Sequence, residues 1–589
     1  MSIDTRPLLE VSWEVANKVG GIHTVVSSKA RLIQEHYEQY ILIGPLLANK
    51  GLDEITEKPA PTHVAAAIDE LSSQGIHCVY GSWNIPGSPS VVLIDANHAS
   101  VDWDYIKAEY WKEFSVDTLY ASWDILEPLR WASAAGMFIN AFQRSYSRPV
   151  IAQFHEWMAG FGALHCRLHN ESVATIFTTH ATVLGRSMSS NTNTDIYEAF
   201  ESLDPAVKAK ELNVFEKHSA ERACAQAAHV FTTVSEITAM ESEFVLSRRP
   251  DVILPNGIVD EQFPDVGEET VVHRQSRERL RDFIYAYFFG NHRFDLDETL
   301  IFFTNGRYEY HNKGLDVLTD ALGRLNNRLR SLNHHKRVVV FYFIPGDSHG
   351  VKKEVLQSVA AFNELKEFVD EQAADMTRRV LRHAHDISMI SSQELLDADA
   401  QQRISELSSN LCDHAPALCT HQLVDEDSDD IISSFKKNGL SNSSDDYIKV
   451  IRMPVYLDGH DDLINLDMQE AAAGCHLGLF ASYYEPWGYT PVESAANGTP
   501  AITTDLAGFG RFIREHQSDQ DGVLVLDRHK RSYEDIVSQL EDSMFEFINL
   551  NRSQRAARRK EAKRVSNTTH WNNFITRYYQ AHDLAYKKL

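Results

Sequence analysis

The residues best suited to chemistry lie in one stretch, Leu477–Asp505, which reads LGLFASYYEPWGYTPVESAANGTPAITTD. Its pattern predicts a strand ending near Ser482, then a loop, then a helix starting near Thr490, with Pro491 in the first turn. A loop that leads into a helix N-terminus favours an anion such as phosphate. Gly488 lets the backbone approach such an anion closely.

Two carboxylates flank that predicted anion site. Glu485 lies in the loop and Glu493 lies in the first turns of the helix. Carboxylates accept hydrogen bonds from sugar hydroxyls strongly, so we expect one of them to hold a transferred sugar and the other a ribose. Taken alone, the pair could equally be one loop acid and one acid that stabilises the helix dipole. The surrounding EPWGYTP loop favours binding.

Positive charge is expected from the segment FFTNGRYEYHNKG, which follows a predicted strand and carries Arg307 and Lys313. A fixed guanidinium and a fixed ammonium can stabilise the negative charge that develops on a nucleoside diphosphate leaving group. A surface ion pair is the alternative. The position of Arg307, directly after a strand and a glycine, favours the site.

Weaker signals lie in the first half of the chain. The segment NKVGG places Gly20 and Gly21 between a strand and a helix, which suits a diphosphate or a sugar. The segment TTHATVLGR adds His180 and Arg186 at another strand end, although a lone histidine is more often structural. Glu156, in the segment FHEW, is a candidate to bind an acceptor sugar.

Other motifs find no support. The chain has neither a G-x-x-x-x-G-K-[ST] loop nor a G-x-G-x-x-G after a strand, which disfavours the P-loop and dinucleotide classes. Cys412, His414, Cys419 and His421 resemble zinc ligands by composition. Without a tight Cys-x-x-Cys pair they do not predict a metal site.

The elements that must position these residues alternate between strand-like and helix-like segments. The expected strands are Leu8–Val15, Val91–Ile94, Pro149–Phe154, Ile176–Thr179, His229–Thr233, Leu300–Thr304, Arg337–Ile344, Tyr447–Ile451, Leu477–Ala481 and Pro500–Thr503. This alternation predicts an α/β protein with parallel sheets covered by helices. Two doubly wound halves would place a ligand cleft where the carboxyl ends of their strands face each other.

Length and composition agree with that organisation. The 589 residues exceed one ordinary core, so two large domains are expected, with a boundary between Leu254 and Leu300. The formal net charge of −26 argues against a nucleic-acid binder. No apolar run is long enough for a membrane helix, and the start lacks the pattern of a secretory signal. The six cysteines fit reduced thiols, so we expect a cytoplasmic protein.

Two further segments stand out. Val351–Leu411 reads as long helices, with apolar residues every seven positions at Val355, Phe362, Val369 and Met376. This stripe could pack on its own domain or form an oligomer contact, and the length of the segment slightly favours the oligomer. The acidic stretch Asp425–Asp446 is expected to be a surface loop.

The end of the chain is basic from Arg552 to Arg564, with Glu561 as the one acid. On a helix, Arg552, Arg555, Arg559 and Lys563 would share a face. From composition alone, a solvated basic face is favoured over a docking site for a phosphate.

Taken together, these motifs resemble the glycogen synthases of animals and fungi. The similar segments, in the order of that family, are LLEVSWEVANKVGGIHTVVSSKA, FHEWMAG, FTTHATVLGR, HVFTTVSEITAMES, LPNG, GRYEYHNKG and GCHLGLFASYYEPWGYTPVE. The resemblance covers nearly the whole chain, and the last segment is very specific. It implies transfer of glucose from UDP-glucose to the non-reducing 4-hydroxyl of an α-1,4-glucan, with retention of configuration and with no metal or other cofactor.

The resemblance also implies a GT-B fold, in which two Rossmann-like domains face each other. The implied ranges are 1–265 for the first domain, 266–565 for the second with a helical insertion at 351–411, and 566–589 for a C-terminal helix that packs back on the first domain. That insertion forms oligomers in the family, so the resemblance implies a homo-tetramer.

Site roles follow from the resemblance by position. Catalytic roles are implied for Glu485, Arg307, Lys313 and His180. Substrate binding is implied for Lys18, Gly20, Gly21, Glu156, Arg186, Asn256, Trp487, Gly488, Tyr489, Thr490 and Glu493. Within these sets, Arg186, Arg307 and Lys313 would hold the donor phosphates. Glu485 would hold the glucose and Glu493 the ribose, while His180 would lie beside the reacting sugar.

Regulation and partners are implied more loosely. A glucose-6-phosphate site would use Arg555, Arg558, Arg559, Lys563 and Arg564, although Glu561 stands where the family tends to be basic. A glycogenin-like primer is a further implied partner. Two other functions stay open: a transferase of the same fold that uses ADP-glucose or builds another glucan, and a non-catalytic glucan-binding scaffold. Nothing in the sequence indicates the pyridoxal-phosphate lysine of a phosphorylase.

Overall fold

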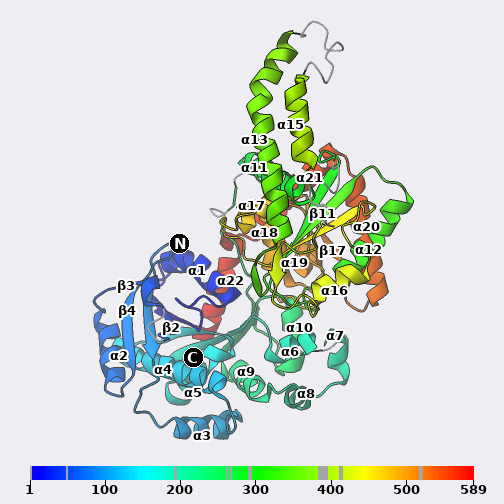
Figure 1. Cartoon of the computed structure of the whole chain (residues 1–589). Helices are drawn as coiled ribbons and strands as arrows, with labels where there is room; N and C mark the ends of the chain where they lie inside the picture. The colour runs from blue at the N-terminus through cyan, green and yellow to red at the C-terminus, as the bar shows by residue number, and fades with distance from the viewer. Residues whose placement is uncertain are drawn as a thin grey trace.

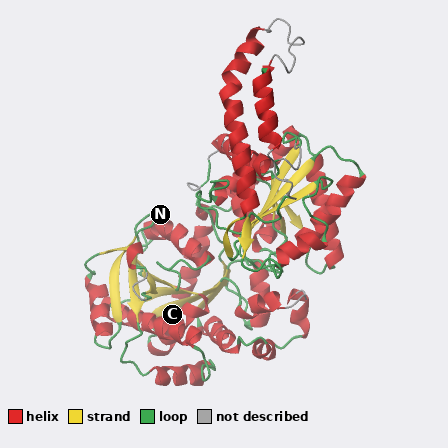
Figure 2. Cartoon of the chain, viewed as in Figure 1, coloured by secondary structure: helices red, strands yellow, loops and turns green. Residues whose placement is uncertain are grey.

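The computed structural model of the chain describes residues 3–47, 51–191, 196–259, 263–264, 268–289, 295–382, 395–409, 416–516 and 522–589. Two large parallel sheets, each flanked by helices, occupy successive halves of the sequence (Figures 1 and 2). A small antiparallel pair formed by β12 (Ser348–Val351) and β13 (His421–Leu423) accompanies the second sheet.

The first sheet has the order β3-β4-β5-β2-β1-β6-β7-β8-β9. Its strands are β1 Leu8–Ser12, β2 Tyr40–Pro45, β3 Ile55–Glu57, β4 His77–Trp83, β5 Ser90–Asp95, β6 Val150–His155, β7 Val173–Thr179, β8 Val230–Thr233 and β9 Val252–Ile253. Its helices are α1 Gly21–His36, α2 Thr62–Ser72, α3 Trp103–Phe114, α4 Trp123–Tyr146, α5 Glu156–His169, α6 Val183–Asn191, α7 Ile196–Ala199, α8 Pro205–Glu211, α9 Phe215–Ala227 and α10 Glu236–Val245. The strands from β5 to β9 run parallel, while β3 and β4 join antiparallel at one edge.

The second sheet has the order β14-β11-β10-β15-β16-β17, and all its strand pairs are parallel. Its strands are β10 Thr299–Asn305, β11 Arg337–Phe343, β14 Ile448–Met453, β15 Leu477–Leu479, β16 Ala501–Thr504 and β17 Val523–Leu526. Its helices are α11 Glu268–Tyr287, α12 Leu315–Ser331, α13 Lys353–Arg382, α15 Ala398–Ser409, α16 Asp430–Lys437, α17 Met468–Gly474, α18 Tyr489–Ala496, α19 Gly508–His516, α20 Tyr533–Asn549 and α21 Arg552–Asn567.

Both sheets reverse their strand order once. In the first sheet the chain starts at the central strand β1, runs outward to the edge formed by β3, β4 and β5, and then returns to β6 beside β1 and runs outward to β9. In the second sheet it starts at β10, runs outward to β14, and then returns to β15 beside β10 and runs outward to β17. At such a switch point the loops at the carboxyl ends of two neighbouring strands diverge and leave room for a ligand. The doubly wound organisation expected from the sequence is therefore confirmed, and it identifies two switch points.

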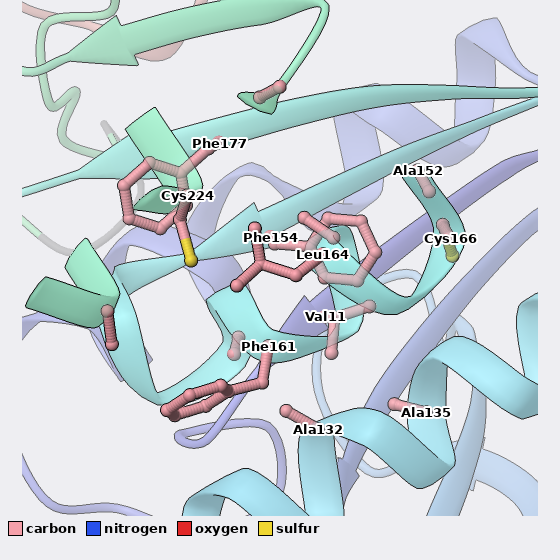
Figure 3. Close-up of a cluster of buried hydrophobic side chains, with 14 of the residues drawn as sticks. Val11, Ala132, Ala135, Ala152, Phe154, Phe161, Leu164, Cys166, Phe177 and Cys224 are labelled. Atoms are coloured by element: carbon pink, nitrogen blue, oxygen red, sulfur yellow. The ribbon is translucent and has the colours of Figure 1, made fainter. Parts of the chain in front are cut away.

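The two faces of the first sheet differ in character. Alternate residues of β1, β6 and β7 point to opposite faces, because side chains in a strand have a period of two. Val11, Phe154 and Phe177 pack against helices α4, α5 and α9 in an apolar cluster, which Figure 3 shows. The other face carries Leu8, Ile151 and Ile176 and belongs to a second cluster that also contains residues of α1.

The last helix, α22 (Trp571–Lys587), lies against the first sheet although it follows the second in the chain (Figure 1). It contacts α1 and strands β6 to β9. Trp571 covers Gly257, where a Cβ would lie 2.5 Å from the indole ring. Phe574 packs edge-on against Trp487 of the second domain. One helix therefore links the cores of both domains.

The structure agrees with the helices expected at 351–411 but not with the loop expected at Asp425–Asp446. Helices α13 and α15 pair and project away from the second sheet (Figure 2). The parts of the expected insertion at 383–394 and 410–411 lie outside the described residues. The expectation of a surface loop over Asp425–Asp446 was wrong, because this stretch contains α16, whose Ile432 and Phe435 are buried. No helix in the described ranges is both long and apolar enough to cross a membrane.

Gly314 lies at the second switch point, where the loop after β10 touches the loop after β15. It has φ +65°, and a Cβ there would lie 1.7 Å from the carbonyl oxygen of Ala481. Gly439 has a similar φ of +66° but open space around it. The backbone of Gly314 therefore touches the end of the β15 segment as closely as a glycine allows.

Gly314→Ala is expected to destabilise the protein much more than Gly439→Ala. The left-handed backbone costs both variants about 1–2 kcal/mol, while the collision with Ala481 adds about 3 kcal/mol to the first alone. Thermal unfolding followed by circular dichroism measures the difference. Equal losses would show that the contact between Gly314 and Ala481 can relax without cost.

Candidate active site

The second switch point brings Lys313 and Glu485 together. Lys313 lies on the loop after β10 and Glu485 on the loop after β15, strands that neighbour each other. Their Nζ and Oε2 atoms are 2.5 Å apart, and both side chains are mostly buried. The sequence placed these residues 172 positions apart, so only the sheet order explains their meeting.

The backbone of the EPWGYTP loop is tied to the segment that follows β16. The amide of Gly508 donates to the carbonyl of Glu485 at 3.0 Å, and the amide of Phe509 donates to that of Trp487 at 2.7 Å. Gly488 is the N-cap of α18 with φ +100°, which favours glycine. One loop, held by these backbone hydrogen bonds, therefore positions both the Glu485 carboxylate and the start of α18.

The side chains in that loop divide between packing and exposure. Trp487 is buried against Phe509 and Phe574, so its ring serves the core between the domains. Tyr489 is partly buried, and its hydroxyl donates to the carbonyl of Gly257 at 3.4 Å. Thr490 is also partly buried. Of the predicted binding residues here, Gly488 and Thr490 keep positions at the helix start that suit a ligand.

Glu493 lies one turn further along α18. Its carboxyl is partly buried, and burial raises its pKa to about 7. A carboxyl whose pKa is raised toward neutral pH by burial is a frequent property of functional sites.

Arg307 has a different setting from Lys313. Its side chain is 61% exposed and pairs with Glu309 at 2.9 Å. Both residues lie on the loop after β10, but in this structure Arg307 is bonded to its own loop. The switch point thus holds one ion pair across its two strands and one within the first loop.

At the first switch point the glycine pair has a partner that the sequence did not suggest. The Glu14 carboxylate accepts hydrogen bonds from the amides of Gly20 at 2.7 Å and His23 at 2.9 Å. It therefore occupies the N-terminus of α1, where the sequence analysis expected a diphosphate or a sugar. Lys18 and Gly21 beside it are exposed.

Glu156 is the second acid at the first switch point. It has φ +66°, an uncommon conformation for a non-glycine residue, and its Oε1 accepts from the amides of His180 at 2.8 Å and Ala181 at 3.2 Å. Burial raises its pKa to about 7. Oε1 of Glu156 therefore holds the loop after β7 in place. The sequence analysis expected this carboxylate to bind an acceptor sugar.

Arg186 faces both switch points. Burial lowers its pKa, but the carboxylates of Glu156, Glu309 and Glu485 outweigh that effect and raise it. Its side chain remains accessible to solvent. One accessible guanidinium therefore lies near acids of both domains, and a guanidinium can bind a phosphate through two parallel hydrogen bonds.

Two side chains that the sequence analysis missed connect the domains. Tyr484, next to Glu485, donates from its hydroxyl to Glu241 on α10 at 2.9 Å. Glu241 also accepts from the amide and the hydroxyl of Thr182, and burial raises its pKa to about 7. Nearby, Asn256 is buried and its Oδ1 has no hydrogen-bond partner in the described residues. Glu241 could have been suspected from the sequence as an acid on the buried side of its helix.

A separate pocket of about 930 Å³ lies between α11 and α21. Its basic lining residues are His273, Arg274, Arg277, Arg281, His335, Lys336, His476, Arg552, Arg555, Arg559 and Lys560. Burial and then the charge of Arg559 lower the pKa of Arg277 to about 9. Glu278, Asp297 and Glu298 also line the pocket, but its arginine and lysine side chains outnumber them. An anion that binds there would relieve the repulsion between these cations.

The basic helix α21 divides its side chains around this pocket. Arg555 and Arg559 line it, whereas Arg558, Lys563 and Arg564 do not. Lys563 is buried and donates to the carbonyl of Ala496 at 3.0 Å. Arg564 pairs with Glu561. Arg555 and Arg559 are half-buried in the pocket wall, and Arg559 contacts His273 of α11.

No metal-binding cluster of histidine, cysteine and acidic residues occurs among the residues that the structure describes. Cys419 is buried and His421 bonds to the Thr420 hydroxyl at 2.8 Å. Cys412 and His414 lie outside the described residues.

Comparison with known proteins places these features in context. The family described as glycogen synthase matches residues 10–589. The liver glycogen (starch) synthase of Mus musculus is 36% identical over 586 residues, which cover 98% of this chain and 83% of that protein. Glycogen (starch) synthase isoform 2 of Saccharomyces cerevisiae is 34% identical and covers 99% and 86%. Among solved structures, the catalytic domain of starch synthase IV from Arabidopsis thaliana, bound to ADP and acarbose, aligns with a TM-score of 0.52 at 12% identity and covers 99% and 100%.

Glu493→Gln is expected to stabilise the ligand-free protein at pH 8 but not at pH 5. The pKa of Glu493 is about 7 in the fold and 4.5 in the unfolded chain, so ionisation opposes folding increasingly as pH rises between these values. Glutamine removes that cost. The melting temperatures of both proteins at pH 5 and pH 8 measure the effect, with Glu38→Gln, an exposed acid, as control. If the difference in melting temperature between the variant and the wild type is no larger at pH 8 than at pH 5, the assigned burial of Glu493 is contradicted.

Proposed function

The chain belongs to the glycogen synthase family, and from this membership we propose that it transfers glucose from UDP-glucose to the end of an α-1,4-glucan. It is a glycosyltransferase, and its two facing doubly wound domains form the GT-B fold predicted from the sequence. The observation that carries the proposal is the convergence of Arg186, Lys313 and Glu485 at two facing switch points. These groups can hold a diphosphate and a sugar side by side.

We infer that the donor binds mainly to the second domain. The start of α18 at Gly488 and Thr490 would receive a phosphate through its amides, and Glu493 would accept hydrogen bonds from the ribose. Glu485, which Lys313 keeps beside a positive charge, would accept from glucose hydroxyls. Arg307 would turn from Glu309 toward the phosphates when the donor arrives.

The reaction we propose retains the configuration of the transferred glucose. The acceptor 4-hydroxyl attacks the anomeric carbon from the side that UDP leaves, the bond from that carbon to the phosphate oxygen breaks, and the departing phosphate takes the hydroxyl proton. Arg186, Arg307 and Lys313 would stabilise the charge on UDP, the task that a metal ion performs in other transferases. This scheme needs no resident cofactor and no covalent intermediate on Glu485.

Closure of the two domains would bring these groups together and exclude water, which would otherwise hydrolyse the activated sugar. The hydrogen bonds from Tyr484 to Glu241 and from Asn312 to Ser190 already join the domains near the site. Both come from loops that carry donor-binding residues, so movement of the domains would also move the donor site.

Transfer of labelled glucose from UDP-glucose to glycogen tests the proposal. Glu485→Gln and Arg307→Ala are each expected to lower kcat by about 10²–10³-fold, the usual effect of removing one electrostatic stabiliser of a transition state. Arg324→Ala removes an exposed arginine that pairs with Glu534 and should leave kcat unchanged. ADP-glucose serves as the competing donor. If the folded wild-type protein uses neither donor, the chain is a glucan-binding scaffold rather than an enzyme.

We further propose that the pocket between α11 and α21 binds glucose-6-phosphate and activates the enzyme. Arg555 and Arg559 on α21 and Arg277 on α11 supply cations in a pocket of about 930 Å³. Of the five residues implied by the family resemblance, Arg555 and Arg559 line this pocket. The proposed contacts therefore shift from Arg558, Lys563 and Arg564 to Arg277, His273 and His476.

Arg559→Ala is expected to abolish activation by glucose-6-phosphate while basal transfer is kept. The phosphate loses a bidentate partner, and such charged hydrogen bonds are the strong ones. Arg558→Ala, on the same helix but outside the pocket, is the matched control. The rise in melting temperature on adding glucose-6-phosphate should vanish only in the first variant. Equal stabilisation of both variants would place the effector elsewhere.

The proposal also covers the oligomeric state, the primer and the cellular location of the enzyme. We propose a homo-tetramer in which the projecting α13–α15 pair contacts neighbouring subunits, supported by the exposed apolar side chains of Leu356 and Leu381. Starting chains would come from a glycogenin-like primer. Cys78, Cys166, Cys224, Cys419 and Cys475 are all free thiols, which supports a reducing, cytoplasmic location.

A further inference from the structure

A chain of buried polar side chains runs beneath the loop that carries His180. On the face of the first sheet covered by α1 and α22, Glu10 of β1 and His155 of β6 interrupt an apolar cluster. His155 Nε2 is 2.6 Å from Glu10 Oε1, and His155 Nδ1 is 3.0 Å from His180 Nε2. Side chains from the middle of β1, the end of β6 and the residue after β7 thus form one continuous hydrogen-bonded chain.

The far end of the chain is a carboxylate with three donors. Glu10 accepts from Lys29 at 2.5 Å, from the Tyr40 hydroxyl and from His155. Glu10 and Lys29 are wholly buried. Burial alone would raise the pKa of Glu10, but Lys29 and His155 outweigh it and hold the pKa far below the usual range. Glu10 therefore stays ionised and can only accept.

The charge on Glu10 decides where the protons lie on both histidines. His155 must carry its proton on Nε2 to donate to Glu10. Burial lowers the pKa of His155, so its ring is neutral and its Nδ1 can only accept. His180 is also neutral, because burial and then His155 lower its pKa well below the usual value. It must therefore donate from Nε2, which leaves Nδ1 as a lone pair.

We propose that Glu10 and His155 are positioning residues, which fix the tautomer of His180 so that its Nδ1 accepts a hydrogen bond from a sugar hydroxyl. This inference rests on the proposed glucosyltransferase function. Among the described residues, none bonds to Nδ1 of His180. The backbone of His180 is held separately by Glu156, and Arg186 lies six residues further along the same loop and helix. Both the ring and the backbone of His180 are therefore held in place beside the proposed donor site.

Stability does not explain the buried charges of this chain. Replacing a buried ion pair by apolar residues of similar volume is often neutral or stabilising. The burial of Lys29 and Glu10 is therefore weak evidence that the pair is there to stabilise the fold. A function that needs a charge at that place accounts for them, and polarising the chain to His180 is such a function.

A second polar branch on the same face provides a contrast. Tyr37 contacts His582 of α22 at 2.8 Å, His582 contacts Gln153 at 3.0 Å, and Gln153 donates to Thr178 at 2.9 Å. This branch continues from Thr178 to the Thr232 hydroxyl at 2.7 Å and contains no charged group. It ties α22 to the sheet without reaching the ring of His180.

Four variants of the full-length enzyme test the proposal. His155→Phe keeps a ring but breaks the chain, and Glu10→Met/Lys29→Met removes its charged end without leaving a charge unpaired. His155→Gln offers one acceptor and one donor at a spacing close to that of the imidazole nitrogens, so it can restore the polarity. Tyr40→Phe removes another hydrogen bond to Glu10 that lies outside the chain. Each is compared with the wild type for kcat and KM with UDP-glucose and glycogen, for affinity for UDP, and for melting temperature.

The expected result separates activity from stability. The phenylalanine variant and the double variant should lose kcat by about 10²-fold. Their affinity for UDP should be unchanged, because neither substitution touches the groups proposed to hold UDP. The glutamine variant should regain most of that loss, and Tyr40→Phe should keep the kcat of the wild type. The double variant should keep its melting temperature within a few degrees.

Three results would overturn the proposal. The first is that His155→Phe or the double variant keeps kcat within about twofold while UDP still binds. The second is that kcat falls only in step with the melting temperature across all four variants, which would assign the chain a purely structural role. The third is that the glutamine variant is no better than the phenylalanine variant. A wild-type protein without transfer activity would instead refute the proposed function, so the two failures are distinguishable.

Discussion

The handedness of parallel crossover connections is the constraint on which this structure depends. Because a strand, a helix and the next parallel strand join in a right-handed sense, a sheet with helices on both faces must reverse its strand order once. The reversal falls between β1 and β6 in one domain and between β10 and β15 in the other. The ends of these four strands deliver Glu14, Glu156, Lys313 and Glu485. The topology of the sheets, rather than proximity in sequence, therefore brings these side chains together.

Helix α22 makes the two domains depend on each other. It closes the face of the first sheet opposite α4 and α5, and its Phe574 packs on Trp487 in the loop that carries Glu485. The same helix covers the face that carries Glu10 and His155, and its His582 forms a separate hydrogen bond with Gln153 of β6. The helix therefore packs on elements that support groups from both domains.

The sequence predicted the elements better than it predicted their partners. Strong apolar runs such as Leu300–Thr304 gave strands close to those observed, and the EPWGYTP segment gave the right loop and helix start. The acidic stretch Asp425–Asp446 was misjudged because its charges hid the apolar side of α16, where Ile431, Ile432 and Phe435 are buried. The pairing of Gly20 with Glu14 depends on the shape of a short loop, and the meeting of α11 and α21 at His273 and Arg559 depends on a contact distant in sequence. One signal was available and unused: Glu10 is an acid within the apolar run LLEVS, a position where burial requires a cation.

The ion pair between Lys313 and Glu485 has a consequence for what the site can accept. As a pair, the two charges tolerate their partial burial, whereas either one alone would carry an uncompensated cost. On the proposed function, a phosphate that recruits Lys313 withdraws the partner of Glu485. A nucleotide without its sugar would leave that carboxylate poorly satisfied, while a nucleotide sugar supplies hydroxyl donors in the same step. The pairing present in the ligand-free protein would therefore favour the intact donor over the released nucleotide, which assists product release as well as selection.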